Sequence, residues 1–423
     1  MSESQKDFRV IAILGFWRTF SGGLIGTGAS IFILVYWGSN FYSGVSAAAI
    51  ALTYVFSPAI AGRISDRIGR RNTLLIATTS NFAIACFFLI VVITVQSTRD
   101  LWLIAFIIIL RLMEGVANGF FWPILQASLS DVSLNCCNGE KADFEAISRR
   151  GMSTYNLGWN LGVLFGQVLL SFITFWNIDM ALVVPVVSQG LNLIIVIKWF
   201  HVPKNIAGRA PVMETPEEIK SGNKHGHVNM HVLTLLLGLI FIFMYGFGLG
   251  DLSTSTTNLY EAQGFGALVG FTEAARLACQ GFTSSKVRLH KHLVQFKLVL
   301  VSGLLVVIFV IMAFLSDIFI ISVFIALFAC SGLLFGILYA ESMNLVVMSG
   351  STAKRGLLMG MFESFIGLGF FIGPLLAGYI TQFIAYSTSY FMNVLVMVVM
   401  MAICIIMALI LAKNGQNQVI RKV

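Results

Sequence analysis

Twelve apolar stretches dominate this sequence of 423 residues and leave few folds open to it. A helix needs ~20 mostly apolar residues to cross the hydrocarbon core of a bilayer. No stretch shows the ten-residue alternation of a membrane β-barrel. The sequence therefore predicts an all-α integral membrane protein with twelve transmembrane helices, near residues 9–37, 41–61, 72–95, 101–129, 150–174, 180–200, 230–250, 264–283, 294–315, 318–346, 356–382 and 387–412.

The basic residues predict how these helices are oriented. All but four of the 27 Lys and Arg lie near the N-terminus, near the even-numbered connections or near the C-terminus. The exceptions are Arg99, in a connection on the other side, and Arg18, Arg111 and Arg276 inside spans. Short cytoplasmic loops carry an excess of Lys and Arg. We therefore expect a multi-pass protein with both termini in the cytoplasm, and we interpret the net charge of +8 as topology and not as nucleic-acid binding.

A polar break divides the chain into two similar halves. We expect a six-helix bundle over residues 1–200, a cytoplasmic linker over 201–229 and a second six-helix bundle with a short tail over 230–423. Three short patterns recur in corresponding places of the two halves, at 62–67 and 281–286, 119–127 and 332–340, and 162–166 and 369–373. Parallel repeats of this kind build transporters whose substrate site lies between two bundles.

The connection after the second span carries five charges and two glycines within residues 62–71, which we call the signature segment. We expect it to form a tight turn. It resembles the signature loop of the major facilitator superfamily, G-x-x-x-D-R-x-G-R-R/K, at every defined position: Gly62, Asp66, Arg67, Gly69, Arg70 and Arg71. The resemblance implies twelve helices in two pseudo-symmetric bundles, alternating access, and a conformational role for this segment.

One face of the fourth span is polar in an otherwise apolar helix. Its members recur at steps of three and four residues, which places them on one side of a helix: Arg111, Glu114, Asn118, Trp122 and Gln126. Arg111 and the residues after it also resemble the R-x-x-Q-G motif of the same superfamily, with Glu114 in place of the usual Gln. In that family the arginine is associated with proton coupling, so the resemblance implies a proton site here.

Other spans carry polar or charged residues that we expect to line the same path, because charges inside a bilayer usually face a cavity or a partner. These candidates are Arg18, Asn156, Asn160, Glu273, Arg276, Tyr339 and Glu363. Each Arg–Glu pair could instead be structural, and Trp122 and Tyr339 could be packing aromatics. Asp251 and Glu341 lie far along their spans, and we interpret them as residues near the membrane surface.

These patterns predict a secondary transporter that moves a small polar or charged organic solute by alternating access, with proton coupling, and that works as a monomer. A multidrug exporter, a lipid or lysolipid flippase, and a non-transporting sensor on the same fold are the alternatives. We expect no enzyme activity and no cofactor, since no phosphate-binding loop or catalytic constellation occurs. We also expect no metal site, because the histidines between 225 and 231 have no Cys or acid at ligand spacing.

Overall fold

A computed structural model describes residues 3–136, 141–200, 227–286, 294–348 and 355–420. Apart from one short 3₁₀ turn, the regular elements in these ranges are α-helices. The expected linker lies outside them, except that residues 227–229 already form the first turn of a helix. The side chain of Asp66 also lies outside the described part, although its backbone is helical.

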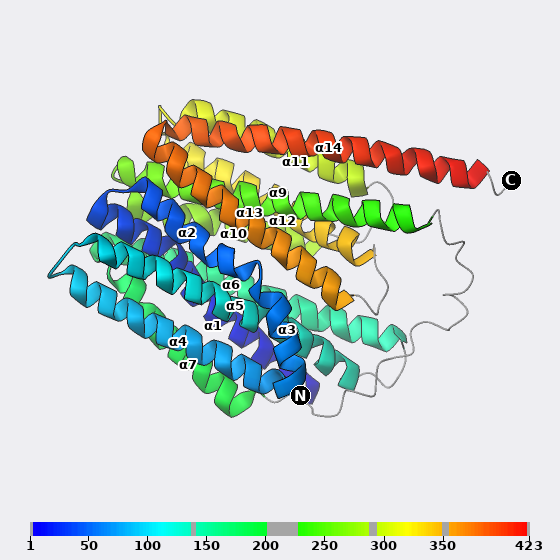
Figure 1. Ribbon diagram of the computed structural model, residues 1–423, viewed down its shortest axis with the longest axis horizontal. Helices are drawn as coiled ribbons and strands as arrows, with labels where there is room; N and C mark the ends of the chain where they lie inside the picture. Colours follow the sequence, from blue (N-terminus) through cyan, green and yellow to red (C-terminus); the bar gives the residue numbers. More distant parts are fainter. Residues whose placement is uncertain (1–2, 137–140, 201–226, 287–293, 349–354, 421–423) are drawn as a thin grey trace.

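Seven helices make up the first half: α1 (Glu3–Trp37), α2 (Asn40–Tyr54), α3 (Ser57–Ile68), α4 (Arg70–Val95), α5 (Leu101–Cys136), α6 (Lys141–Trp176) and α7 (Met180–Trp199). The second half contains α9 (His227–Ala262), the 3₁₀ turn η1 (Gly266–Leu268), α10 (Val269–Lys286), α11 (Val294–Leu315), α12 (Ile321–Met348), α13 (Arg355–Phe383) and α14 (Tyr386–Ile420). Figure 1 shows them running side by side along the long axis of the molecule.

The two halves pair their helices in the same way. In the first, α1 packs on α6, α2 on α5 and α4 on α7; in the second, the corresponding pairs are α9 with α13, α10 with α12 and α11 with α14. Between the halves, α2 packs on α13 and α6 packs on α10. This arrangement confirms the predicted fold, two pseudo-symmetric bundles of transmembrane helices that meet along two helix pairs.

The predicted spans agree with the helices except at the eighth. Eleven segments of the described chain are long and apolar enough to cross a membrane, and α10 is not among them. This helix has 18 residues and carries Glu273 and Arg276, both buried. Because α10 packs between α12 and α6, its charges face protein and its low hydropathy is compatible with a place inside the fold.

The second span is built from two helices, α2 and α3, and its end corrects one prediction. Pro58 stands at the start of α3, where a missing backbone N–H costs nothing. The expected ten-residue turn is wrong, because α3 continues to Ile68 and α4 begins at Arg70. Gly69 alone makes the turn, with φ of 90°, a conformation that L side chains rarely adopt. We call this side of the molecule the Gly69 end and the opposite side the Asn40 end.

Helices α1 and α6 approach each other too closely for side chains at their contact. A methyl group added at Gly162 would collide with the carbonyl oxygen of Phe16 and the hydroxyl of Thr19. That hydroxyl already bridges the two helices, because it donates to the carbonyl oxygen of Trp159 at 2.8 Å. Small residues at such contacts let membrane helices pack closely, which is a main source of their association energy.

Replacement of Gly162 by leucine is therefore expected to remove most of the folded protein. Four extra carbon atoms would push α6 off α1 along the longest contact of the first bundle, and overpacking alone costs about 1–3 kcal/mol or more. The yield of monodisperse protein after detergent extraction measures the effect. Leu157→Ala, on the same helix but 61% exposed, is the matched control and is expected to leave the yield unchanged. A normal yield of Gly162→Leu would contradict the close packing.

Candidate functional site

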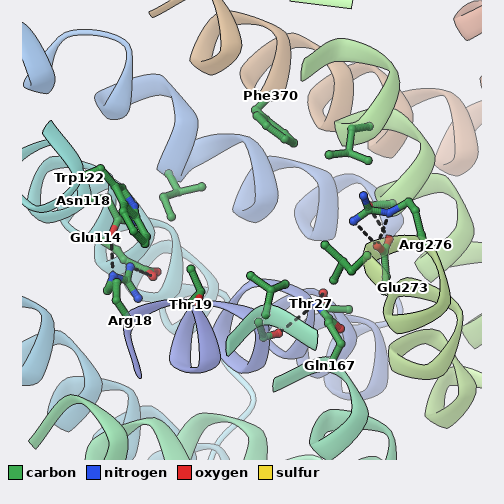
Figure 2. A pocket seen from close by; sticks show the side chains of 17 residues that line it. Arg18, Thr19, Thr27, Glu114, Asn118, Trp122, Gln167, Glu273, Arg276 and Phe370 are labelled. Carbon is green, nitrogen blue, oxygen red and sulfur yellow. Dashed lines mark hydrogen bonds and ion pairs between the residues drawn. The ribbon is translucent and has the colours of Figure 1, made fainter. Parts of the chain in front are cut away.

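A cavity of about 340 Å³ lies between the two bundles. Its wall combines residues of α1, α2, α5 and α6 with residues of α9, α10 and α13. In Figure 2 the charged residues of the two halves face each other across it, Arg18 and Glu114 on one side and Arg276 and Glu273 on the other. The polar wall also includes Thr19, Thr27, Asn118, Trp122, Gln167 and Ser253.

On the side of the first bundle, Glu114 holds two arginines. The Nη2 of Arg18 lies 2.7 Å from Glu114 Oε1, and Nη1 of Arg111 contacts Glu114 Oε2. The Nε of Arg18 donates to Oδ1 of Asn118 at 2.6 Å. The three charged residues are at most 3% exposed. Two guanidinium groups and one carboxylate leave this cluster with one positive charge in excess.

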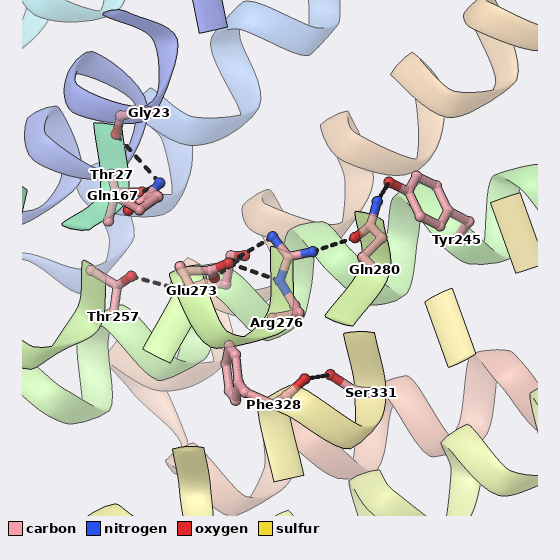
Figure 3. A network of polar contacts seen from close by, with 11 residues as sticks. Gly23, Thr27, Gln167, Tyr245, Thr257, Glu273, Arg276, Gln280, Phe328 and Ser331 are labelled. Carbon is pink, nitrogen blue, oxygen red and sulfur yellow. Dashed lines mark hydrogen bonds and ion pairs between the residues drawn. The ribbon is translucent and has the colours of Figure 1, made fainter. Parts of the chain in front are cut away.

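On the side of the second bundle, the charges balance. Arg276 pairs with Glu273 at 2.7 Å and donates through Nη1 to Oε1 of Gln280, also at 2.7 Å. Gln280 donates in turn to the hydroxyl of Tyr245 at 2.8 Å, so a continuous chain of hydrogen bonds leads away from the cavity (Figure 3). Ser253 of α9 donates to the other oxygen of Glu273. These contacts fix the guanidinium at the cavity wall.

Contacts between α2 and α13 close the interface on both sides of the cavity. Toward the Gly69 end, the hydroxyl of Tyr54 donates to Glu363 Oε2 at 3.0 Å. Toward the Asn40 end, the backbone N–H of Asn40 donates to Oε1 of Gln382 at 2.8 Å, and its side chain donates to the carbonyl oxygen of Thr381 at 3.2 Å. Each set of contacts joins the two bundles directly.

The structure brings six of the predicted residues to the cavity wall: Arg18, Glu114, Asn118, Trp122, Glu273 and Arg276. Arg111 does not line the cavity itself, but it forms an ion pair with Glu114, which does. Gln126 does not line the cavity. It lies within hydrogen-bonding reach of the predicted residue Glu363 and of Tyr155. The ring of Tyr339 contacts that of Tyr245 at a tilt of 51°, with ring centroids 5.4 Å apart.

Asn156 and Asn160 make contacts within α6. The Nε1 of Trp159 donates to Oδ1 of Asn156 at 3.1 Å, and Asn160 donates to the backbone oxygen of Asn156 at 2.8 Å. Asn160 also lies against Gly281 of α10. Both residues therefore lie outside the cavity wall in this conformation, and Asn160 belongs to the contact between the bundles.

The basic residues of the signature segment tie α4 to its neighbours. The Nε of Arg70 lies 3.1 Å from Oδ2 of Asp131 on α5, and its Nη1 donates to Ser65 at 3.0 Å. Arg71 donates to the carbonyl oxygen of Ile197 on α7 at 2.8 Å. Gly62 is half-buried and Arg67 is exposed. Arg70 and Arg71 thus brace α4 against three other helices of its bundle at the Gly69 end, α3, α5 and α7.

Several wall residues were missed by sequence reasoning. Thr19, Gly23 and Thr27 repeat every four residues on α1, and Gln167 of α6 donates to Thr27 at 2.9 Å. The repeat was a usable signal, because small and hydroxyl-bearing residues on one face of an apolar helix indicate close contacts or a cavity. Ser253 gave no such signal, since it lies among many polar residues of α9.

Among the described residues, no group of three or more His, Cys, Asp or Glu is placed to hold a metal ion. The cavity can instead act by charge and hydrogen bonding. In a wall with little water, fixed charges interact more strongly with a bound solute than they would in bulk solvent.

Comparisons with solved structures show the same architecture in transporters. A mutant of the nucleoside transporter NupG has a TM-score of 0.69 at 13% identity, over 96% of this chain and all of that one. The human organic anion transporter MFSD10 (TETRAN) has a TM-score of 0.62 at 14% identity, with the same coverage. A structure described under substrate recognition in proton dependent oligopeptide transporters has a TM-score of 0.69 at 13% identity, over 97% and 100%.

A comparison with curated proteins finds no match. A family profile, in contrast, covers most of the chain: the profile of the Major Facilitator Superfamily matches residues 11–346. This match includes the signature segment, the charged face of α5 and the pair on α10. Together with the two-bundle fold, it shows that the chain is a multi-pass integral membrane protein that belongs to the Major Facilitator Superfamily.

Proposed function

We propose that this protein is a secondary active transporter that moves a small polar or charged organic solute by alternating access, coupled to protons, as a monomer. The observation that carries the proposal is the cavity at the bundle interface, whose walls present buried charges of both signs. Buried charges inside a membrane protein are costly and typically mark a transport path. A purely apolar substrate would gain nothing from such a wall.

The charge distribution supports a solute that carries a carboxylate or another anionic group. The cluster of Arg18, Arg111 and Glu114 has one positive charge in excess, whereas the pair of Glu273 and Arg276 is neutral. A guanidinium binds a carboxylate with two parallel hydrogen bonds, which gives orientation as well as affinity. We infer that the anionic end of the solute contacts Arg18 and that its other end lies toward α10. Acids and zwitterions fit this arrangement.

The contacts of α2 with α13 support the alternating-access mechanism. The two bundles are joined by one set of contacts near Tyr54 and another near Asn40, and breaking one set would widen access to the cavity from that end. At Gly44 the helices approach so closely that an added methyl group would lie 2.5 Å from the backbone oxygen of Pro374. Rocking of the two bundles about the central site would separate these contacts in turn.

The proposed orientation places the Gly69 end, with both termini, in the cytoplasm. Cysteines introduced at two exposed positions of a cysteine-free variant test it, Arg63 on α3 and Gln263 at the other end of the molecule. In intact cells, a membrane-impermeant thiol reagent is expected to label Gln263→Cys and to reach Arg63→Cys only after the membrane is opened. The reverse pattern would contradict the orientation.

The substrate class can be tested with purified protein. A thermal-shift screen of polar solutes is expected to give hits among carboxylated and zwitterionic compounds, since a ligand that binds only the folded state raises Tm. Hits are then tested for uptake into proteoliposomes with an imposed pH gradient. Arg18→Gln is expected to remove the shift by acids and to leave any weaker shift by uncharged solutes. Hits limited to lipophilic cations would overturn the proposal in favour of a multidrug exporter.

A further inference from the structure

A buried carboxylate lies away from the cavity, between α9 and α14. Asp251 is fully buried within the protein. Ser389 donates to its Oδ1 at 2.9 Å, and Nδ2 of Asn393 donates to its Oδ2. Ser255, one turn along α9, shares a hydrogen bond of 2.7 Å with Ser389. The carboxylate is thus surrounded by two hydroxyls and one amide.

Nothing in the described chain balances the charge of this group. Glu114, Glu273 and Glu341 each form an ion pair with Arg or Lys, but no ion pair joins Asp251 to a basic residue in the ranges the structure covers. An uncompensated charge in a protein interior costs several kcal/mol. The groups that donate hydrogen bonds to it are neutral, and the nearby hydroxyl of Tyr390 contacts Thr256 at 2.8 Å.

The amide of Asn393, next to this carboxylate, is incompletely paired. The Oδ1 of Asn393 is buried and has no hydrogen-bond partner among the described residues. An unpaired buried acceptor costs about 1–3 kcal/mol. Rotating the amide by 180° would exchange the two atoms and leave the nitrogen without a partner instead. In the rotated orientation, however, the amide oxygen would face the carboxylate, as two ligands of one cation would.

We propose that Asp251, Ser255, Ser389 and Asn393 form a binding site for one monovalent cation, with Na⁺ as the test ion. Carboxylate, hydroxyl and amide oxygens are the ligands that hard cations prefer. One carboxylate among neutral oxygens balances a single charge, whereas Ca²⁺ sites usually collect several carboxylates. A proton on Asp251 would also neutralise the carboxylate, and the responses of Tm to Na⁺ and to pH distinguish the two ions.

A row of polar residues on α9 offers the ion a route to this site. Asp251, Ser255 and Asn258 lie on one face of the helix at steps of four and three. Asn258 donates to Thr381 of α13 at 2.9 Å and accepts from Ser43 of α2 at 3.2 Å. The row therefore ends at the contact between the bundles, toward the Asn40 end. Separation of α2 from α13 would expose it, so cation binding would favour one conformation of the transporter.

Thermal unfolding of the purified protein in detergent tests the site without any transport assay, so the outcome is independent of the proposed function. Tm is compared in NaCl and in choline chloride at equal ionic strength and pH. For the unaltered protein we expect Na⁺ at ten times its dissociation constant to raise Tm by about 2 °C. Asp251→Asn is expected to abolish the rise. Ser389→Ala, which keeps the carboxylate, is expected to need about tenfold more Na⁺ for the same rise.

The matched control is Glu341→Gln, which removes a carboxylate of the same bundle that is 1% exposed and paired with Lys297. This variant is expected to unfold at a lower temperature and to keep the full response to Na⁺. A response that survives in both Asp251→Asn and Ser389→Ala would overturn the proposal. So would a Tm that depends on pH in choline chloride but never on Na⁺, which would indicate a proton alone. If Asp251→Asn does not fold, Ser389→Ala decides the question.

Discussion

Replacement of Glu114 by glutamine is expected to destabilise the protein by about 3–5 kcal/mol, because it leaves two buried guanidinium groups without a counter-charge. In the unaltered protein, Arg18 contacts one oxygen of this carboxylate and Arg111 contacts the other. Glutamine keeps the shape and one acceptor but no charge. We expect a clear fall in Tm and loss of solute uptake, since Arg18 would lose the charged one of the two partners that hold it at the cavity wall. Thermal unfolding and uptake into proteoliposomes measure the two effects.

A double variant separates charge balance from shape. Glu114→Gln combined with Arg111→Gln has the same net charge in the cluster as the unaltered protein, one positive charge on Arg18. It is expected to recover most of the lost stability, since buried ion pairs can often be replaced by neutral groups at little cost. A single variant as stable as the unaltered protein, or a double variant less stable than the single one, would show that the ion pairs do not control the fold here.

The sequence predicted the helices of this fold because the bilayer constrains them strongly. Eleven spans follow from length and hydropathy alone. The eighth, α10, does not meet those criteria as a helix, although residues 264–283 were predicted as one of the twelve apolar stretches. The signature segment was misread as a loop, because charges suggest a solvated turn. Helix α3 instead continues about two turns past Gly62. The chain reverses direction at Gly69, the one residue of the segment with positive φ.

The site was predictable along each helix but not between helices. Helical phase correctly placed Arg111, Glu114 and Asn118 on one face of α5. The same reasoning gave no means to see that Arg18 of α1 shares Glu114, a contact between residues 96 positions apart. Asp251 shows the limit most clearly. Its partner Asn393 is 142 positions away, so the sequence offered only its distance along the span, which suggested a surface.

Glu363→Gln is expected to abolish proton-driven accumulation while exchange of solute continues. Each of the carboxylates at the cavity wall, Glu114 and Glu273, pairs with an arginine, so its protonation would break an ion pair. Glu363 has no ion pair with a basic residue within the described ranges, and its carboxylate accepts a hydrogen bond from the hydroxyl of Tyr54, on the opposite bundle. When α2 leaves α13 at the Gly69 end, this contact breaks and the carboxylate gains access to water.

This position suits a residue that takes up and releases a proton once per cycle. A gradient of one pH unit supplies about 1.4 kcal/mol, enough for about tenfold accumulation of a solute that moves with one proton. Proteoliposomes loaded with the variant are expected to lose that accumulation and to retain exchange of labelled for unlabelled solute. Its Tm is expected to stay near that of the unaltered protein, because glutamine still accepts the hydrogen bond from Tyr54.

Two further variants make the result specific to the carboxylate of Glu363. Tyr54→Phe removes the same hydrogen bond but keeps the acid, so accumulation is expected to persist with an altered rate as the closed state loses a contact. Glu341→Gln removes a carboxylate that faces Lys297 and not the other bundle, and it is expected to keep its accumulation ratio. If Glu363→Gln accumulates solute to the full ratio, the proton must bind elsewhere. The remaining candidates would then be Glu114 and Glu273, whose ion pairs would have to open during the cycle.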